Sequence, residues 1–235
     1  MPAWLYGVVV IFYLHGFASS ARSSKAAFFA TRLRELGLAL ETPDFNEPDF
    51  STLTISRMVQ QVIAKIDAHP GVPCVLIGSS LGAFVAVQVA ALRPERIDGM
   101  ILLAPALDFG GNRMRSLGDR GLDEWKRTNR LDVFHYGYGR MIQVHYELYS
   151  DARRYDCVDA ALTMPIQIFQ GRADTAVDPE SVEGWGKARP NVELHMLDDD
   201  HQLMASLPYI WGEVKRFLTS KSPSTAPARP LAPGS

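Results

Sequence analysis

The sequence predicts an α/β protein in which a minimal, mostly parallel sheet of about six strands carries helices on both faces. Short runs rich in Val, Ile and aromatic residues alternate along the chain with longer amphipathic runs. The strand-like runs are continuously apolar, which is typical of strands buried on both faces. Hydrophobic residues make up 47 % of the 235 residues, which is enough for one ordinary globular core.

The first half of the chain supplies these elements in regular order. Residues 6–14 are rich in Val, Ile and aromatic residues and predict the first buried strand. A helix is expected to begin at Ser23, because apolar residues including Phe29 and Leu33 recur every three to four positions after it, and to end at Gly37. The same alternation predicts strands at 38–42, 73–78 and 97–104 and helices at 51–68 and 81–92.

The alternation stops at residue 105 and resumes near residue 165. Residues 105–160 carry a Gly-Gly pair, many charges and a late aromatic cluster, which predicts a helical cap inserted between two strands. Strands at 165–170 and 192–197 and helices at 179–188 and 204–218 follow. Residues 221–235 hold four prolines and no aromatic residue, so we expect a disordered tail after one domain that spans residues 1–220.

Charge and cysteine content exclude several classes of protein. The 24 basic and 26 acidic residues leave a net charge of −2, which argues against nucleic acid as a partner and favours neutral substrates. Two cysteines, Cys74 and Cys157, are too few for a disulfide scaffold and include no Cys-x-x-Cys pair. The apolar run 5–14 is too short to span a membrane, and without a visible export signal we expect a cytoplasmic protein. The sequence does not define an oligomeric state.

The most informative motif is Gly78-Ser79-Ser80-Leu81-Gly82, which lies where a predicted strand passes into a predicted helix. It matches Gly-x-Ser-x-Gly with Ser80 at its centre, whereas a frame centred on Ser79 lacks the flanking glycines. In this pattern the serine occupies a sharp turn, and the glycines allow close backbone approach while the hydroxyl stays exposed. We therefore predict Ser80 as a nucleophile.

The general base is expected late in the chain, after the last strand. Six histidines are present, and His201 is the one in the loop that directly follows the strand predicted at 192–197. His195 lies inside that strand. Loops at the carboxyl ends of parallel strands carry the sites of open α/β sheets, which favours His201 as the base. Three aspartates precede it and are expected to favour its protonated form.

The acid is expected in the loop after the strand at 165–170. Asp174 lies three residues past Gly171, where it could orient His201 and stabilise the imidazolium. Asp178 is the alternative acid, but its place directly before a proline is typical of a helix N-cap.

Two backbone amides are predicted to bind the developing oxyanion. Gly16 allows the chain to turn after the first strand, so that the amide of Phe17 points toward the site. The amide of Leu81, which follows the nucleophile, is the second donor. We expect His15 to orient the backbone of this loop rather than to transfer protons.

Taken together, these motifs resemble the α/β-hydrolase superfamily over roughly residues 6–220. The segment YLHGFASS at residues 13–20 and the Gly-Ser-Ser-Leu-Gly turn are similar to those of a group of small bacterial serine esterases. The mitochondrial acyl-protein thioesterase branch is also similar, since it shares the turn and a late loop with Asp and His. The resemblance implies an α/β-hydrolase fold and a hydrolase of carboxylic esters or thioesters that needs no cofactor or metal.

The sequence therefore predicts a carboxylic ester hydrolase that acts on small, neutral esters of short to medium acyl chains through an acyl-enzyme. Aromatic and apolar residues of the cap are expected to line the acyl pocket: Trp125, Phe134, Tyr138, Met141 and Tyr146.

Other functions remain open at this stage. Thioester or peptide hydrolysis and perhydrolysis would use the same residues. A catalytically silent binding module with this fold would normally have lost one of Ser80, Asp174 and His201, which are all present. The sequence argues against a nucleotide-binding protein, because it has no Gly-Lys-Ser/Thr loop, and against a metal hydrolase, because it has no His-Glu-x-x-His motif.

Overall fold

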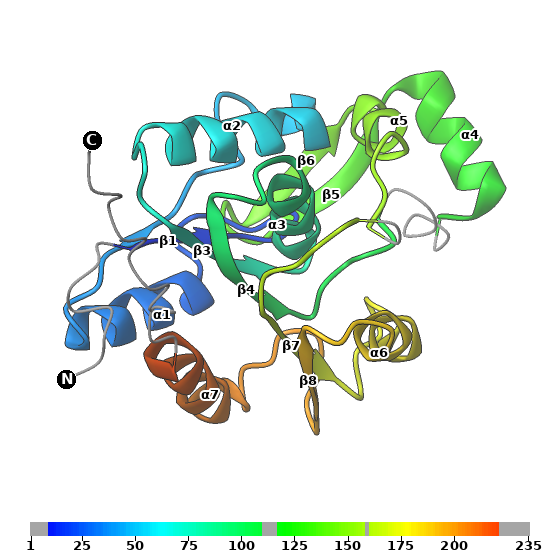
Figure 1. Ribbon diagram of the computed structural model, residues 1–235. Helices are drawn as coiled ribbons and strands as arrows, with labels where there is room; N and C mark the ends of the chain where they lie inside the picture. The colour runs from blue at the N-terminus through cyan, green and yellow to red at the C-terminus, as the bar shows by residue number, and fades with distance from the viewer. Residues whose placement is uncertain (1–8, 110–116, 158–159, 221–235) are drawn as a thin grey trace, which may run out of the picture.

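The computed structural model describes residues 9–109, 117–157 and 160–220. Six parallel strands form one sheet in the order β2-β1-β3-β4-β7-β8, which confirms the predicted α/β architecture (Figure 1). The strands are β1 (Val10–Leu14), β2 (Leu40–Glu41), β3 (Cys74–Ser79), β4 (Ile97–Leu103), β7 (Ile166–Gly171) and β8 (Val192–Leu197). The predicted tail at 221–235 lies outside the described residues.

Helices cover both faces of the sheet (Figure 1). On one face lie α1 (Ser24–Glu35) and α7 (Leu207–Ser220), and on the other lie α2 (Ile55–Asp67), α3 (Leu81–Leu92) and α6 (Pro179–Lys187). In β1, Ile11 and Tyr13 pack in the core with α1 and α7, whereas Phe12 and Leu14 pack with α2 and α3. Because both sets are buried, the strand reads as a continuous apolar run.

Some predicted boundaries differ from the observed ones for local reasons. The helix predicted at 51–68 begins only at Ile55, because the Thr54 hydroxyl accepts a hydrogen bond from the Arg57 amide and caps it. A separate 3₁₀ turn, η2 (Phe50–Thr52), precedes it. The strand predicted at 38–42 pairs over two residues only, as expected for a short edge strand.

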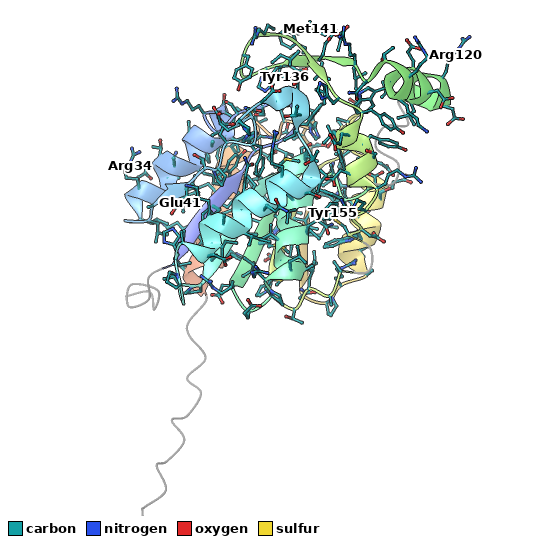
Figure 2. The ribbon with its side chains drawn as sticks, turned by 90° about the horizontal axis from the view of Figure 1, so that it is seen from above. Arg34, Glu41, Arg120, Tyr136, Met141 and Tyr155 are labelled. Atoms are coloured by element: carbon teal, nitrogen blue, oxygen red, sulfur yellow. The ribbon has the colours of Figure 1, made fainter. Side chains whose placement is uncertain are left out.

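The cap between β4 and β7 contains a β-hairpin as well as helices. Its elements are α4 (Gly118–Thr128), β5 (Leu131–His135), β6 (Arg140–Val144) and α5 (Glu147–Ala152). The expectation of a purely helical cap was therefore incomplete. The strands pair antiparallel from Leu131↔Val144 to His135↔Arg140, and Figure 2 shows Tyr136 and Met141 at the outer edge of the cap. The side chains of β5 alternate between partly buried and exposed, as in a strand with one face toward solvent. In the sequence this alternation is hidden, because the exposed position Phe134 is aromatic.

Both cysteines are buried as free thiols, as expected for small apolar residues. Within the described residues, no helix is long and apolar enough to cross a membrane.

Polar contacts join the cap to the rest of the molecule. The buried Asp151 of α5 accepts hydrogen bonds from the Ser56 amide, at 2.7 Å, and from the Ser56 hydroxyl, at 2.6 Å. The Tyr155 hydroxyl lies 2.7 Å from the Ser56 oxygen and can donate to it, because Ser56 gives its own hydrogen to the carboxylate. This contact fixes α5 to the first turn of α2.

We expect Asp151→Ala to lower the free energy of unfolding by about 2 kcal/mol, because two charge-assisted hydrogen bonds are lost from a buried group. Urea denaturation would measure the change, with Asp132→Ala on the exposed side of β5 as the control. An Asp151→Ala protein within about 0.5 kcal/mol of wild type would contradict this account.

Candidate active site

Ser80 lies in the tight turn between β3 and α3, at φ 53° and ψ −115°. This left-handed conformation is unfavourable for a residue with a side chain, so it is kept by the packing around it. A Cβ on Gly78 would lie 2.5 Å from the Ala83 Cα, and one on Gly82 would lie 2.0 Å from the Leu14 carbonyl oxygen. Glycine is therefore sterically required on both sides of Ser80.

Three loops at the carboxyl edge of the sheet bring Ser80, His201 and Asp174 together. The His201 Nε2 atom lies 3.1 Å from the Ser80 Oγ atom, and the His201 Nδ1 atom lies 2.8 Å from Asp174 Oδ2. An ionised carboxylate can only accept, so Nδ1 carries the hydrogen and Nε2 is free to accept one from Ser80. Asp178 instead caps α6, where it accepts from the amides of Glu180 and Ser181.

Asp174 is buried and remains ionised. Burial by itself raises the pKa of this carboxyl group, but hydrogen bonds from His201, the Val177 amide and Gln170 outweigh it, so the pKa lies below its ordinary value. The amides of Ala176 and Val177 each donate to Oδ1 at 2.8 Å, and the Gln170 side-chain amide donates to Oδ2 at 2.9 Å. Each carboxylate oxygen of Asp174 therefore accepts two hydrogen bonds.

Gln170 and Lys25 are polar residues near the site that the sequence analysis did not assign to it. Gln170 is fully buried at the end of β7, and a glutamine at the carboxyl end of a mostly apolar strand, four residues before Asp174, is the signal that could have drawn attention to it. Lys25 is buried in α1. Desolvation lowers its pKa to about 8, although the negative charges of Asp200, Asp174 and Asp199 act in the opposite direction.

The loop after β1 approaches the Ser80 turn closely. A Cβ on Gly16 would lie 3.2 Å from the Ser79 carbonyl oxygen and 3.3 Å from the Ser80 Cβ. The His15 ring donates from Nδ1 to the Gly16 carbonyl at 2.9 Å and accepts from the Phe45 amide at Nε2, at 3.0 Å. Both hydrogen bonds are to backbone groups, and Nε2 also lies 3.4 Å from Asp44 Oδ1. This approach places the Phe17 segment beside the first turn of α3, which begins at Leu81.

The cap residues predicted to line an acyl pocket are either packed inside the cap or exposed to solvent. The Trp125 indole is buried inside the cap, where it donates to the Val144 carbonyl and packs against Tyr146. The other three residues lie on the hairpin with 46 %, 47 % and 57 % of their surface exposed: Phe134, Tyr138 and Met141. The strand alternation turns Phe134 and Met141 outward as a cross-strand pair, so packing of the cap and solvent exposure explain these residues better than a pocket does.

A groove of about 500 Å³ lies along α6, and its lining contains none of the three triad residues. We call it the α6 groove, and its lining is Pro105, Leu107, Asp108, Tyr155, Asp156, Val177, Asp178, Ser181, Val182, Gly184, Trp185, Ala188 and Arg189. Two hydrogen bonds link segments of the groove with the triad. The amide of Ala106, which lies between the lining residues Pro105 and Leu107, donates to the Ser80 carbonyl at 3.2 Å, and the amide of the lining residue Val177 donates to Asp174. Its volume lies in the range of small-molecule sites.

A cluster of possible metal ligands occurs on β8 and α7, away from the triad. Glu193, His195 and Glu213 offer ligand atoms within 4.8 Å of one another. The Arg216 guanidinium pairs with both carboxylates, so these groups form an ion-pair network.

The sheet order, the strained serine turn and the three side chains at its edge define an α/β hydrolase fold. A family model described as an uncharacterised protein family, UPF0227, matches residues 10–219, and the chain belongs to that family.

Solved structures support the fold. Est1E from Butyrivibrio proteoclasticus with bound ferulic acid superposes with a TM-score of 0.79 at 22 % identity, over 91 % of this chain and 89 % of that one. The alpha/beta hydrolase domain-containing protein 10 from mouse gives 0.77 at 19 % identity, over 90 % of each chain. These two structures confirm the predicted α/β-hydrolase fold.

Curated relatives are similar over shorter stretches. Lipase LipV of Mycobacterium tuberculosis is 36 % identical over 66 residues, which are 28 % of this chain and 25 % of the lipase. The mouse palmitoyl-protein thioesterase ABHD10, a mitochondrial protein, is 22 % identical over 71 % of this chain and 59 % of its own length. The chain thus spans less than two thirds of the length of these relatives.

We expect Gln170→Leu to reduce kcat for ester hydrolysis about tenfold, because the Asp174 carboxylate loses one of the donors that hold it toward His201. The matched control is Gln167→Leu, which removes a glutamine of equal burial from the same strand, where it bonds Glu193 instead. Equal rates for the two variants would contradict a role of Gln170 in the site.

Proposed function

We propose that this protein is a serine hydrolase that cleaves carboxylic esters of short to medium acyl chains. The observation that carries the proposal is the continuous hydrogen-bond chain from Ser80 through His201 to Asp174, built on a turn whose strain keeps the serine hydroxyl exposed. A strand-to-helix turn with only a structural role would not require a histidine and an aspartate from two other loops to be hydrogen-bonded in series with its serine.

The geometry supports a two-step acyl transfer. His201 Nε2 takes the Ser80 hydroxyl proton as Oγ attacks the ester carbonyl, and the buried Asp174 stabilises the imidazolium that forms. The oxyanion is bound by the amides of Phe17 and Leu81. As the tetrahedral intermediate collapses, the carbon–oxygen bond to the alcohol breaks and His201 gives its proton to the alcohol. Water then attacks the acyl-enzyme by the same route and releases the carboxylic acid.

The α6 groove is the proposed site of the acyl chain. In the tetrahedral intermediate the oxyanion points to the amides of Phe17 and Leu81, and the leaving oxygen must reach His201 Nε2. The acyl substituent takes the remaining direction. We assign the groove to that direction because the residues that line it follow β4 and β7 and belong to neither the loop after β1 nor the His201 loop. Its largely apolar lining suits a hydrocarbon chain.

Thioester hydrolysis is the second candidate, favoured by the similarity to a palmitoyl-protein thioesterase over 71 % of this chain. The triad would perform the same steps with a thiol as leaving group. A chain-length series separates the two: best activity beyond about twelve acyl carbons would favour the thioesterase.

Ser80→Ala is expected to lower kcat for p-nitrophenyl esters by about four to six orders of magnitude and to abolish labelling by a fluorophosphonate probe. Ser79→Ala is the matched control, because it changes the neighbouring buried serine. Mapping of the labelled peptide identifies the reacting residue. Labelling at another position, or a Ser80→Ala protein with more than about a tenth of wild-type activity, would refute the proposed function.

Gly184 offers a direct test of the acyl site. It lines the α6 groove, and a Cβ at this position has no neighbour within 4 Å, so a larger side chain can be placed there. We expect Gly184→Leu to lower kcat/KM for p-nitrophenyl octanoate about tenfold while kcat/KM for the acetate changes little.

Gly212→Leu in α7 is the matched control, since its Cβ also has open space but lies outside the groove. Leucine is a better helix former than glycine, so both proteins should fold. An unchanged octanoate-to-acetate ratio in Gly184→Leu would place the acyl chain elsewhere. A changed preference for the alcohol part of the ester would assign the groove to the leaving group.

A further inference from the structure

The loop that carries Phe17 is held from outside by the cap hairpin. The Tyr136 amide, at the end of β5, donates to the Ala18 carbonyl at 2.8 Å. Gly137 packs so closely on this loop that a Cβ would lie 2.9 Å from the Ser20 Cβ. Ala18 itself has φ 54°, a left-handed conformation that an alanine adopts only when its surroundings impose it. The hairpin is part of those surroundings.

A second connection runs through the fully buried ring of His135, and the chemistry of the groups fixes its direction. The Tyr138 amide donates to His135 Nδ1 at 3.1 Å, so this nitrogen carries no hydrogen. Nε2 is therefore the protonated nitrogen and donates to Asn46 Oδ1 at 3.1 Å. The Asn46 side-chain amide then donates to the Ser19 carbonyl at 2.9 Å.

Aromatic rings enclose this relay. Tyr138 stacks on His135 with ring centroids 4.0 Å apart, and Phe50 contacts the same ring edge-on at 4.5 Å. Phe50 in turn packs against Phe17, with centroids 5.4 Å apart. The side chain of the oxyanion residue and the carbonyls of the next two residues are thus all connected to the cap.

The relay requires a neutral imidazole. Desolvation lowers the pKa of His135, whereas the negative charge of Asp44 acts in the opposite direction. A second proton would place a hydrogen on Nδ1 directly opposite the Tyr138 amide.

We propose that His135 and Asn46 are positioning residues for the loop after β1 that carries Phe17, which we call the oxyanion loop. The Phe17 amide then reaches its place only when the hairpin of β5 and β6 is docked on this loop. The inference rests on the proposed function, because it assigns these residues to the same site. A displacement at Ala18 or Ser19 rotates the peptide units next to Phe17 and turns its N–H away from the oxyanion. The cap therefore acts on the chemical step through the loop that carries Phe17.

The test compares His135→Leu, Asn46→Leu and the double variant in ester hydrolysis. The oxyanion interaction is made chiefly in the transition state, so kcat should fall about 10- to 100-fold while KM stays within about twofold. The double variant should be no more than about threefold worse than the more severe single variant, because both break one relay. His135→Gln should recover most of kcat, since its amide can donate to Asn46.

His145→Leu is the matched control, because it alters another histidine of the cap, whose backbone amide rather than its ring bonds Ser51. Hydrogen exchange of the peptide over residues 14–22 supplies a readout that does not depend on activity. It should be faster in His135→Leu and Asn46→Leu than in wild type and His145→Leu.

Two outcomes would overturn the proposal. One is a folded His135→Leu protein with kcat within about threefold of wild type, or with a raised KM alone. The other is unchanged exchange in the 14–22 peptide. If the wild-type protein hydrolyses no ester, the proposed function fails. The exchange measurement alone then still decides whether His135 and Asn46 position the loop that carries Phe17.

Discussion

The close approach of the first turn of α3 to the end of β1 is the steric constraint on which the site depends. Gly82 leaves no room for a Cβ beside the Leu14 carbonyl, and Gly78 leaves none beside Ala83. This contact holds Ser80 in its strained turn and at the same time brings the loop after β1 next to the nucleophile. The proposed nucleophile and oxyanion donors are therefore neighbours because of one backbone contact between two central elements of the fold.

The electrostatics of the site follow from where the parallel strands end. The turns after β3, β7 and β8 lie at the carboxyl edge of the sheet, so a buried carboxylate, an imidazole and a hydroxyl meet there. Burial by itself raises the pKa of Asp174, and the hydrogen-bond donors around it bring that pKa below its ordinary value. The same arrangement explains why a glutamine, Gln170, is buried at the end of β7, where it donates to Asp174.

The cap shows how one insertion can serve packing and positioning. Trp125 and its aromatic neighbours extend the hydrophobic core on the α2 and α3 side of the sheet, and Asp151 fixes α5 to α2. The hairpin presents one side to solvent and places His135 against the oxyanion loop. The aromatic residues that the sequence suggested for substrate binding are thus accounted for by structure, whereas the α6 groove is built from scattered positions on three segments.

The sequence by itself determined the strand order along the chain, the buried character of the sheet, the serine turn and the identity of Ser80, Asp174 and His201 as candidates. These features are local, because they depend on periodicity, on glycine at sterically closed positions and on loops that directly follow strands. The approach of His201 to Asp174, the α6 groove and the His135–Asn46 relay depend on residues that are 27 to 89 positions apart. Only the tertiary structure decided those, since no local pattern specifies which distant backbone carbonyl a buried side chain will meet.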